Sequence, residues 1–129
     1  MHEITNRPKR ILIVEDHEVS LELLEDLLTP PEFECHAAPD GITAIRKLKE
    51  NEYDIVIMDI LLPDINGLEI VREFRKTNTD SYVIAISAYP RSETEATCIE
   101  AGCNEFIGKP YDIEALLLKL IKFQVRHQG

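Results

Sequence analysis

The sequence predicts an α/β fold in which a doubly wound parallel sheet of five strands is covered by five helices. Short aliphatic runs such as 11–14 and 55–58 have the uniformly apolar character of strands buried on both faces of a parallel sheet. These runs alternate with longer segments of helical periodicity. Five such strand–helix units imply right-handed crossovers, with helices on both faces of the sheet.

The expected elements follow one another without a repeat or a low-complexity segment. Strands are expected near residues 10–14, 33–38, 54–58, 82–86 and 104–107. Helices are expected near residues 18–29, 41–51, 66–76, 91–102 and 112–126. Turn and cap residues support these limits: Pro30 and Pro31 stop the first helix, Asp40 suits the N-cap of the second, and Gly102 suits the C-terminal cap of the fourth.

The helices differ in the apolar face that they offer to the sheet. The expected inward faces are Ser20, Leu23, Leu24, Leu27 and Leu28 in the first helix, Ala44, Ile45 and Leu48 in the second, Ile70, Val71 and Phe74 in the third, and Ile113, Leu116, Leu117, Leu120 and Ile121 in the fifth. The fourth helix, with Thr94 and Thr97, has the poorest apolar face. We therefore expect it to be the least firmly held.

Length and composition indicate one soluble domain. The 129 residues suffice for a single core, here residues 10–126, between a flexible N-terminal tail (1–9) and a C-terminal tail (127–129). No apolar stretch approaches the roughly 20 residues of a membrane span. The N-terminus has no apolar core of the kind that signal peptides contain, so a cytoplasmic location is expected.

Charge and cysteine content narrow the possible partners. The chain has 24 acidic and 14 basic residues, a net charge of −10, which disfavours direct binding to nucleic acid or to an anionic membrane. It suits a divalent cation or a basic protein surface. Cys35, Cys98 and Cys103 are odd in number and lack CxxC spacing, so they are interpreted as small buried hydrophobic residues.

Polar residues stand at the ends of the apolar strands: Glu15 and Asp16, Asp59, Ser87, and Lys109. In a parallel sheet, ligands bind where the strands end. Three carboxylates, one hydroxyl and one ammonium are therefore expected in a single crevice. Each residue alone has a simpler explanation, for example helix capping or a solvated surface position, and it is their combination that favours a chemical site.

The three carboxylates predict a magnesium site, because Mg²⁺ prefers hard oxygen ligands and relieves their mutual repulsion. Ser87 and Lys109 add a hydroxyl and a positive charge, which a bound phosphoryl group needs and a simple metal store does not. Asp59 is the best candidate nucleophile, since the most uniformly apolar strand precedes it. The turn-forming segment 62–67 after it is positioned to wrap the site.

Four segments carry a resemblance to a known family: residues 11–16 (ILIVED), 58–67 (MDILLPDING), 86–88 (ISA) and 106–110 (FIGKP). Over about residues 10–124 the chain resembles the receiver domains of two-component response regulators. The resemblance implies a flavodoxin-like fold with strand order 2-1-3-4-5. It also implies a phosphoacceptor signalling domain that catalyses its own Mg²⁺-dependent phosphoryl transfer, rather than an enzyme acting on other substrates.

Carried onto this sequence, the resemblance implies that Asp59 accepts a phosphoryl group from a phosphohistidine. The implied Mg²⁺ ligands are Glu15, Asp16, Asp59 and the backbone carbonyl of Leu61. Ser87 would hydrogen-bond the attached phosphoryl group, and Lys109 would pair with it.

The resemblance also implies a conformational switch. Phe106 would be the aromatic residue that turns inward when Ser87 moves, and the surface around the fourth and fifth helices would report the change. The Lys109–Pro110 bond resembles the cis peptide of the family. Leu61 and Tyr89 occupy positions that influence loss of the phosphoryl group; leucine cannot orient a water and tyrosine can screen the site, so slow self-hydrolysis is expected.

The implied partners are a sensor histidine kinase or a histidine phosphotransfer protein, and a downstream protein target. Val19 and Leu21 are interpreted as lying off the apolar stripe of the first helix, where they either dock such a partner or are scattered surface residues. In the fifth helix, Leu118, Phe123 and Val125 suggest either a second contact surface, for example of a phosphorylation-dependent dimer, or a broad core-facing stripe.

Three other functions compete with this interpretation. An aspartate-nucleophile phosphatase would need an acid where Leu61 stands, and a flavin site would need glycine-rich phosphate loops. A receiver-like module that acts by protein contact without phosphorylation is the main alternative. The sequence is compatible both with a stand-alone receiver and with a receiver cut from a hybrid kinase or a longer regulator.

Overall fold

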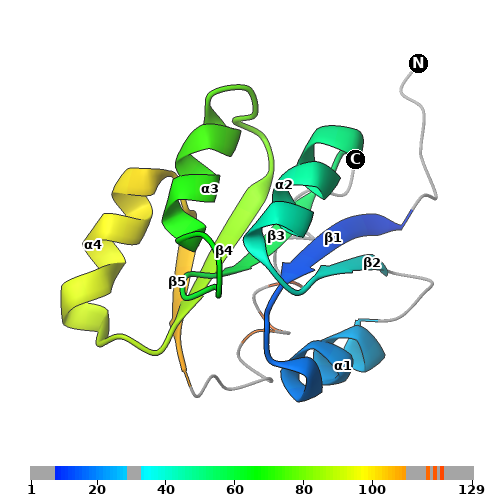
Figure 1. Cartoon of the computed structure of the whole chain (residues 1–129), viewed down its shortest axis with the longest axis horizontal. Helices are drawn as coiled ribbons and strands as arrows, with labels where there is room; N and C mark the ends of the chain where they lie inside the picture. The colour runs from blue at the N-terminus through cyan, green and yellow to red at the C-terminus, as the bar shows by residue number, and fades with distance from the viewer. Residues whose placement is uncertain (1–7, 29–32, 110–115, 117, 119, 121–129) are drawn as a thin grey trace.

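The computed structural model describes residues 8–28, 33–109, 116, 118 and 120 (Figure 1). Its strands are β1 (Lys9–Val14), β2 (Phe33–Ala38), β3 (Ile55–Asp59), β4 (Tyr82–Ser87) and β5 (Glu105–Gly108). Its helices are α1 (Glu18–Leu27), α2 (Gly41–Glu50), α3 (Gly67–Arg75) and α4 (Arg91–Ala101). All nine elements agree with the predicted ones to within one or two residues at most ends.

The five strands form one parallel sheet in the order β2-β1-β3-β4-β5, which confirms the predicted topology. Val14 of β1 is paired with Met58 of β3, so the residues that follow these strands leave the sheet at the same edge. The chain runs from β1 outward to β2 and then returns past β1 to β3. The crevice between the ends of β1 and β3 is therefore the switch point at which such sheets bind ligands.

The sheet separates two apolar cores, because successive strand residues point to opposite faces. In β1, Leu12 and Val14 pack toward α2, α3 and α4, whereas Ile11 and Ile13 pack toward α1. Leu116 and Leu120 are buried in the second core, on the α1 side. Helices thus cover both faces, as expected for a doubly wound sheet.

Side chains at the helix starts fix where three of the helices begin. The backbone N–H groups of Ser20, Thr43 and Leu68 donate to the side chains of the N-cap residues His17, Asp40 and Asn66, respectively. By contrast, α4 begins after Pro90 without a side-chain cap. Gly102 ends α4 with φ at 114°, a left-handed conformation that glycine adopts readily, as the sequence predicted.

The structure corrects the predicted apolar stripe of α1. Leu21 is half-buried and packs with Leu24 and Leu28 against the second core, whereas Leu23 is 45% exposed. Positions 21, 24 and 28 are spaced i, i+3 and i+7, so they share one helical face, and position 23 lies well off that face. The interpretation of Leu21 as a residue outside the stripe is therefore wrong. Val19, at 68% exposed, does lie outside it.

Smaller differences concern the ends of the chain. β1 begins at Lys9, one residue before the predicted start of the first strand, and residues 1–7 of the predicted N-terminal tail lie outside the described residues. Most of the predicted fifth helix (112–126) lies outside the described residues, as do Pro110, the interpreted surface residues Phe123 and Val125, and the 127–129 tail. Leu118 is described and is exposed. In the described part of the chain, no helix has the length and apolar character needed to cross a bilayer.

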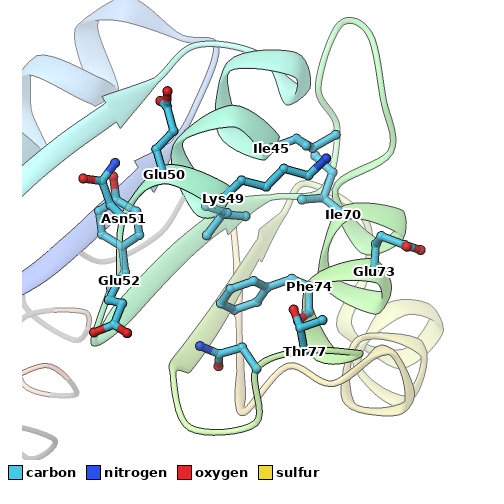
Figure 2. A pocket seen from close by; sticks show the side chains of 12 residues that line it. Ile45, Lys49, Glu50, Asn51, Glu52, Ile70, Glu73, Phe74 and Thr77 are labelled. Carbon is cyan, nitrogen blue, oxygen red and sulfur yellow. The ribbon is translucent and has the colours of Figure 1, made fainter.

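A cavity of about 700 Å³ lies between the C-terminal ends of α2 and α3 (Figure 2). Its walls include Ile45 of α2 with Ile70 and Phe74 of α3, and Tyr53, just before β3, contributes to the lining. These residues lie toward the amino ends of the strands. The cavity is thus distinct from the crevice at the carboxyl ends, where the candidate functional residues gather.

Candidate functional site

Three carboxylates meet at the carboxyl ends of β1 and β3. Oxygen atoms of Glu15, Asp16 and Asp59 all lie within 4.8 Å of one another. Glu15 and Asp59 are buried, with only 1% and 2% of each residue exposed, whereas Asp16 is exposed. The predicted convergence of these acids is confirmed, and it places two buried negative charges beside a third that reaches solvent.

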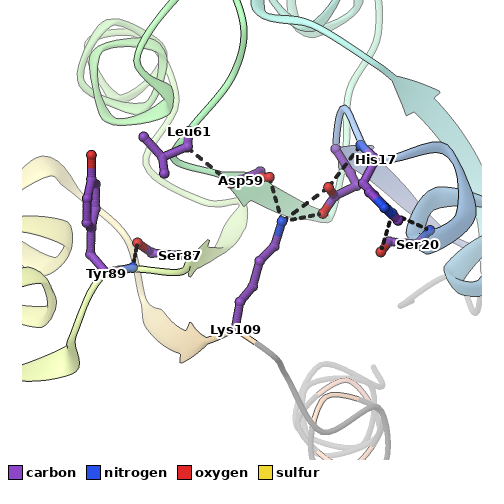
Figure 3. Close-up of polar contacts among 8 residues, drawn as sticks. His17, Ser20, Asp59, Leu61, Ser87, Tyr89 and Lys109 are labelled. Atoms are coloured by element: carbon purple, nitrogen blue, oxygen red, sulfur yellow. Dashed lines mark hydrogen bonds and ion pairs between the residues drawn. The ribbon is translucent and has the colours of Figure 1, made fainter.

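A single lysine partly compensates for this charge. The Nζ atom of Lys109 lies 2.8 Å from Oδ2 of Asp59 and 3.2 Å from both carboxylate oxygens of Glu15 (Figure 3). Lys109 follows β5, 50 residues after Asp59 and 94 after Glu15. One ammonium therefore serves two buried carboxylates that the fold brings together.

This arrangement shifts the proton affinities of the site. Burial raises the pKa of Glu15, and the negative charge of Asp59 raises it further, so that the effect of Lys109 is outweighed. Burial by itself would lower the pKa of Lys109, but the hydrogen bond to Asp59 and the charges of Asp59 and Glu15 together raise it. The ammonium is held in its charged form, while the ionised form of Glu15 is disfavoured.

The acid cluster fits a hard cation. Oε1 of Glu15 accepts a hydrogen bond from the backbone N–H of His17, whereas Oε2 is buried and has no hydrogen-bond partner among the described residues. The Lys109 ammonium lies 3.2 Å from Oε2, but Asp59 shares it, so a second positive charge would further reduce the cost of burying the ionised carboxylates. Carboxylate oxygens are the ligands that Mg²⁺ prefers, and exposed Asp16 leaves the cluster open to solvent.

The loop after β3 is folded tightly against Asp59. The backbone N–H of Leu61 donates to Oδ1 of Asp59 at 3.1 Å, and the N–H of Gly67 donates to the carbonyl of Ile60 at 2.8 Å. Leu61 also forms an antiparallel bridge with Asn66. A Cβ atom at Gly67 would lie 2.4 Å from the carbonyl oxygen of Asp59, so only glycine fits there. The role of the Leu61 carbonyl as a metal ligand stays a prediction.

Ser87 ends the neighbouring strand β4 and is fully buried. Its Oγ accepts a hydrogen bond from the backbone N–H of Tyr89 at 2.9 Å, and its carbonyl accepts from the N–H of Lys109 at 2.7 Å. The hydroxyl proton of Ser87 is not used in that bond. Leu61 and Tyr89, the residues expected to tune hydrolysis, are both exposed beside the site (Figure 3).

Phe106 of β5 is buried in the core between the sheet and helices α2, α3 and α4. The Arg91 guanidinium carbon lies 5.1 Å from the centre of the Phe106 ring, and an Arg91 nitrogen donates to the Phe106 carbonyl at 3.4 Å. Arg91 also pairs with Glu95 one turn along α4. Sequence reasoning missed Arg91, because nothing local marks an arginine at a helix start as a partner of a residue 15 positions later.

Fold and site together define an α/β domain with a lysine-bearing acid cluster at the crossover of β1 and β3. The family model described as "response regulator receiver domain" matches residues 11–121, nearly the whole of this domain. The chain therefore belongs to the response regulator receiver domain family, a family of signal-transduction domains. This confirms the resemblance carried by the strand-end motifs.

Known relatives show the settings in which similar chains occur. Regulatory protein VanRB of Enterococcus faecalis is 34% identical over 93% of this chain, which covers 54% of VanRB. Sensor histidine kinase RcsC of Salmonella typhi is 30% identical over 95% of this chain, which covers 13% of RcsC. The chain thus spans about half or less of these relatives.

A solved structure supports the same assignment. Response regulator TrrA of Thermotoga maritima, in complex with Mg²⁺-BeF, is 33% identical to this chain and has a TM-score of 0.78. The match covers 89% of this chain and 98% of the TrrA chain. TrrA therefore resembles this chain over almost its full length.

Proposed function

We propose that this chain is a phosphoacceptor, in which Asp59 takes a phosphoryl group from a phosphohistidine in a Mg²⁺-dependent step. The observation that carries the proposal is the position of Asp59. It is a buried carboxylate at the switch point, within 4.8 Å of two further acids and 2.8 Å from a lysine ammonium. A nucleophile, a cation site and a positive charge for phosphoryl oxygens are thus available together.

In the proposed step, a carboxylate oxygen of Asp59 attacks phosphorus while the bond between phosphorus and the histidine nitrogen breaks. The electron pair of that bond stays on the imidazole nitrogen, which takes a proton from solvent. Glu15, Asp16, Asp59 and the Leu61 carbonyl would hold Mg²⁺, which when bound neutralises charge on the phosphoryl oxygens. Lys109 stays near the acyl phosphate and pairs with its oxygens.

Ser87 would meet the phosphoryl group with the hydroxyl proton that its bond to Tyr89 does not use, and movement of the Ser87–Tyr89 turn would pass the change toward α4. Phosphorylation adds charge that these groups must satisfy, which biases a two-state equilibrium of the surrounding loop. Phe106 and the surface around the fourth and fifth helices would report the new state. This part of the proposal rests on the Ser87–Tyr89 hydrogen bond and on the uncapped start of α4.

A sensor histidine kinase or a histidine phosphotransfer protein would be the donor, and a further protein or a domain of the same protein would be the target. The relatives VanRB, a regulatory protein, and RcsC, a sensor histidine kinase, fit this proposal. Val19 is exposed at the start of α1, directly after the acidic loop, and is the stronger of the two docking candidates. Leu21 is half-buried and packs against the second core, so it offers a partner less contact area than Val19 does.

The test is the intact mass of the protein after incubation with acetyl phosphate, with Mg²⁺ or with excess EDTA. The expected result is one phosphoryl adduct that requires Mg²⁺ and is lost in Asp59→Asn. Asp26→Asn, which makes the same change at an exposed position of α1, is the matched control and should keep the adduct. No adduct on folded wild-type protein would overturn the proposal and favour a module that acts by contact alone.

A further inference from the structure

Asp64 ties the loop after Asp59 to the start of α2. Oδ1 of Asp64 accepts the backbone N–H of Gly41 at 2.7 Å, and Oδ2 accepts the N–H of Ile42 at 2.9 Å. Oδ1 also accepts the N–H of Ile65 at 2.9 Å. One carboxylate thus collects three backbone donors, two of which come from the first two residues of α2.

These donors have no partner inside their own helix. The first N–H groups of any helix lack an intrahelical acceptor, and the positive end of the helix dipole favours an anion there. Asp40, the N-cap, accepts from Thr43, which leaves Gly41 and Ile42 to Asp64. The hydrogen bond from Gly41, and to a lesser extent those from Ile42 and Ile65, lower the pKa of Asp64. The carboxylate therefore stays ionised near neutral pH.

The contact is close enough to restrict side chains on both sides. A Cβ atom at Gly41 would lie 2.9 Å from Cβ of Ile65, 3.0 Å from Oδ1 of Asp64 and 3.1 Å from Cδ1 of Ile70. Such separations are shorter than normal packing distances. Gly41 therefore allows the tip of the loop to sit directly on the start of α2.

The other end of the same loop forms one wall of the acid cluster. Leu61 donates to Asp59, is bridged to Asn66 across the loop, and lies three residues before Asp64. Both arms of the loop are thus held at their base, and Asp64 holds the tip.

We propose that Asp64 is a positioning residue for the cation site: by fastening the loop tip to the start of α2, it holds the Leu61 carbonyl where a metal ligand is needed. This inference rests on the proposed function and adds a residue to it. Asp64 does not touch the metal itself. Asp64 restricts the loop after β3 to fewer conformations in the metal-free protein. Less conformational entropy is then lost when the loop is ordered by Mg²⁺ binding.

The experiment measures the Mg²⁺ dissociation constant by calorimetric titration for wild type, Asp64→Ala, Asp64→Asn and the control Asp26→Asn. Asp64→Ala removes every acceptor and should weaken Mg²⁺ binding about fivefold. Asp64→Asn keeps one side-chain oxygen that can accept from Gly41. The fold-change in its Mg²⁺ dissociation constant should be less than half of that in Asp64→Ala. Amide hydrogen exchange at Gly41 and Ile42 should accelerate in Asp64→Ala.

Three outcomes would overturn the inference. Equal Mg²⁺ affinity in Asp64→Ala and Asp26→Asn would show that the bonds from Asp64 to the start of α2 do not affect the cation site. Equal losses in Asp64→Asn and Asp64→Ala would assign the effect to charge rather than to loop position. Unchanged exchange at Gly41 and Ile42 would show that Asp64 does not hold these amides. Failure of wild type to bind Mg²⁺ would instead overturn the proposed function, and this inference with it.

Discussion

Lys109, which follows β5, and Asp59, which ends β3, are joined by a 2.8 Å ion pair, and Glu15 shares the same ammonium. The lysine is thus the local counter-ion of the acid cluster in this state. A site with two buried carboxylates and one cation is electrostatically incomplete.

Lys109→Met should destabilise the metal-free protein by about 3 kcal/mol at pH 7.5, because it leaves Glu15 and Asp59 as uncompensated buried charges. Mg²⁺ should restore part of the loss. Urea denaturation with and without Mg²⁺ measures both effects. Lys76→Met, which breaks the exposed Lys76–Glu73 pair, is the control and should cost less than about 1 kcal/mol. Equal losses in the two variants would contradict the prediction.

Glu15→Gln should raise the melting temperature of the metal-free protein by about 3 °C at pH 7.5. The folded-state pKa of Glu15 is raised, so the stabilising state is the protonated one, and stability is lost as pH rises through that pKa. The advantage of Glu15→Gln should therefore shrink as pH falls toward the ordinary value of 4.5. Thermal melts across pH, with exposed Glu22→Gln as control, test this. A gain independent of pH would refute it.

Gly67→Ala should cost about 3 kcal/mol and disturb the phosphoacceptor, because its Cβ would lie 2.4 Å from the carbonyl oxygen of Asp59. Gly108→Ala is the matched control, since among the described residues the nearest atom to its Cβ is Cε1 of Phe106 at 4.0 Å. Urea denaturation compares the two variants. Similar stabilities would mean that the loop after β3 yields easily to an added methyl group.

Arg91→Ala should loosen Phe106 and cost about 1 kcal/mol, because the guanidinium lies over its ring. Arg72→Ala is the control: Arg72 also pairs with a glutamate on its own helix, Glu69. Aromatic NMR relaxation of Phe106 reads out its mobility, and urea denaturation gives the stability. If Phe106 relaxes identically in both variants, Arg91 does not hold it.

Leu61→Asn should shorten the lifetime of the phosphorylated protein several-fold, because an amide beside Asp59 can orient the attacking water and leucine cannot. Leu61→Ala is the control for side-chain size, and this variant should still lose its phosphoryl group slowly. Decay of the phosphoryl adduct is followed by intact mass. Rapid loss from the unmutated protein would contradict the expected slow self-hydrolysis, whatever the variants do.

The sequence by itself determined the strand pattern, the doubly wound topology and the acids of the site. These follow from local signals: uninterrupted aliphatic runs mark strands buried on both faces, and each run is followed directly by the polar residue that the sheet edge presents. Parallel strands necessarily bring their carboxyl ends to one side. Glu15, Asp16 and Asp59 therefore lie at one edge of the sheet, and they meet there because β1 and β3 are neighbouring strands.

Only the tertiary structure decided which face of α1 is buried and which distant residues hold the site in place. Leu21 and Leu23 are chemically the same, so periodicity alone cannot choose between them, and contact with the sheet does. Asp64 meets Gly41 from 23 positions away, and Arg91 meets Phe106 from 15. Such contacts depend on the relative placement of whole elements, which long-range packing sets and no local pattern records.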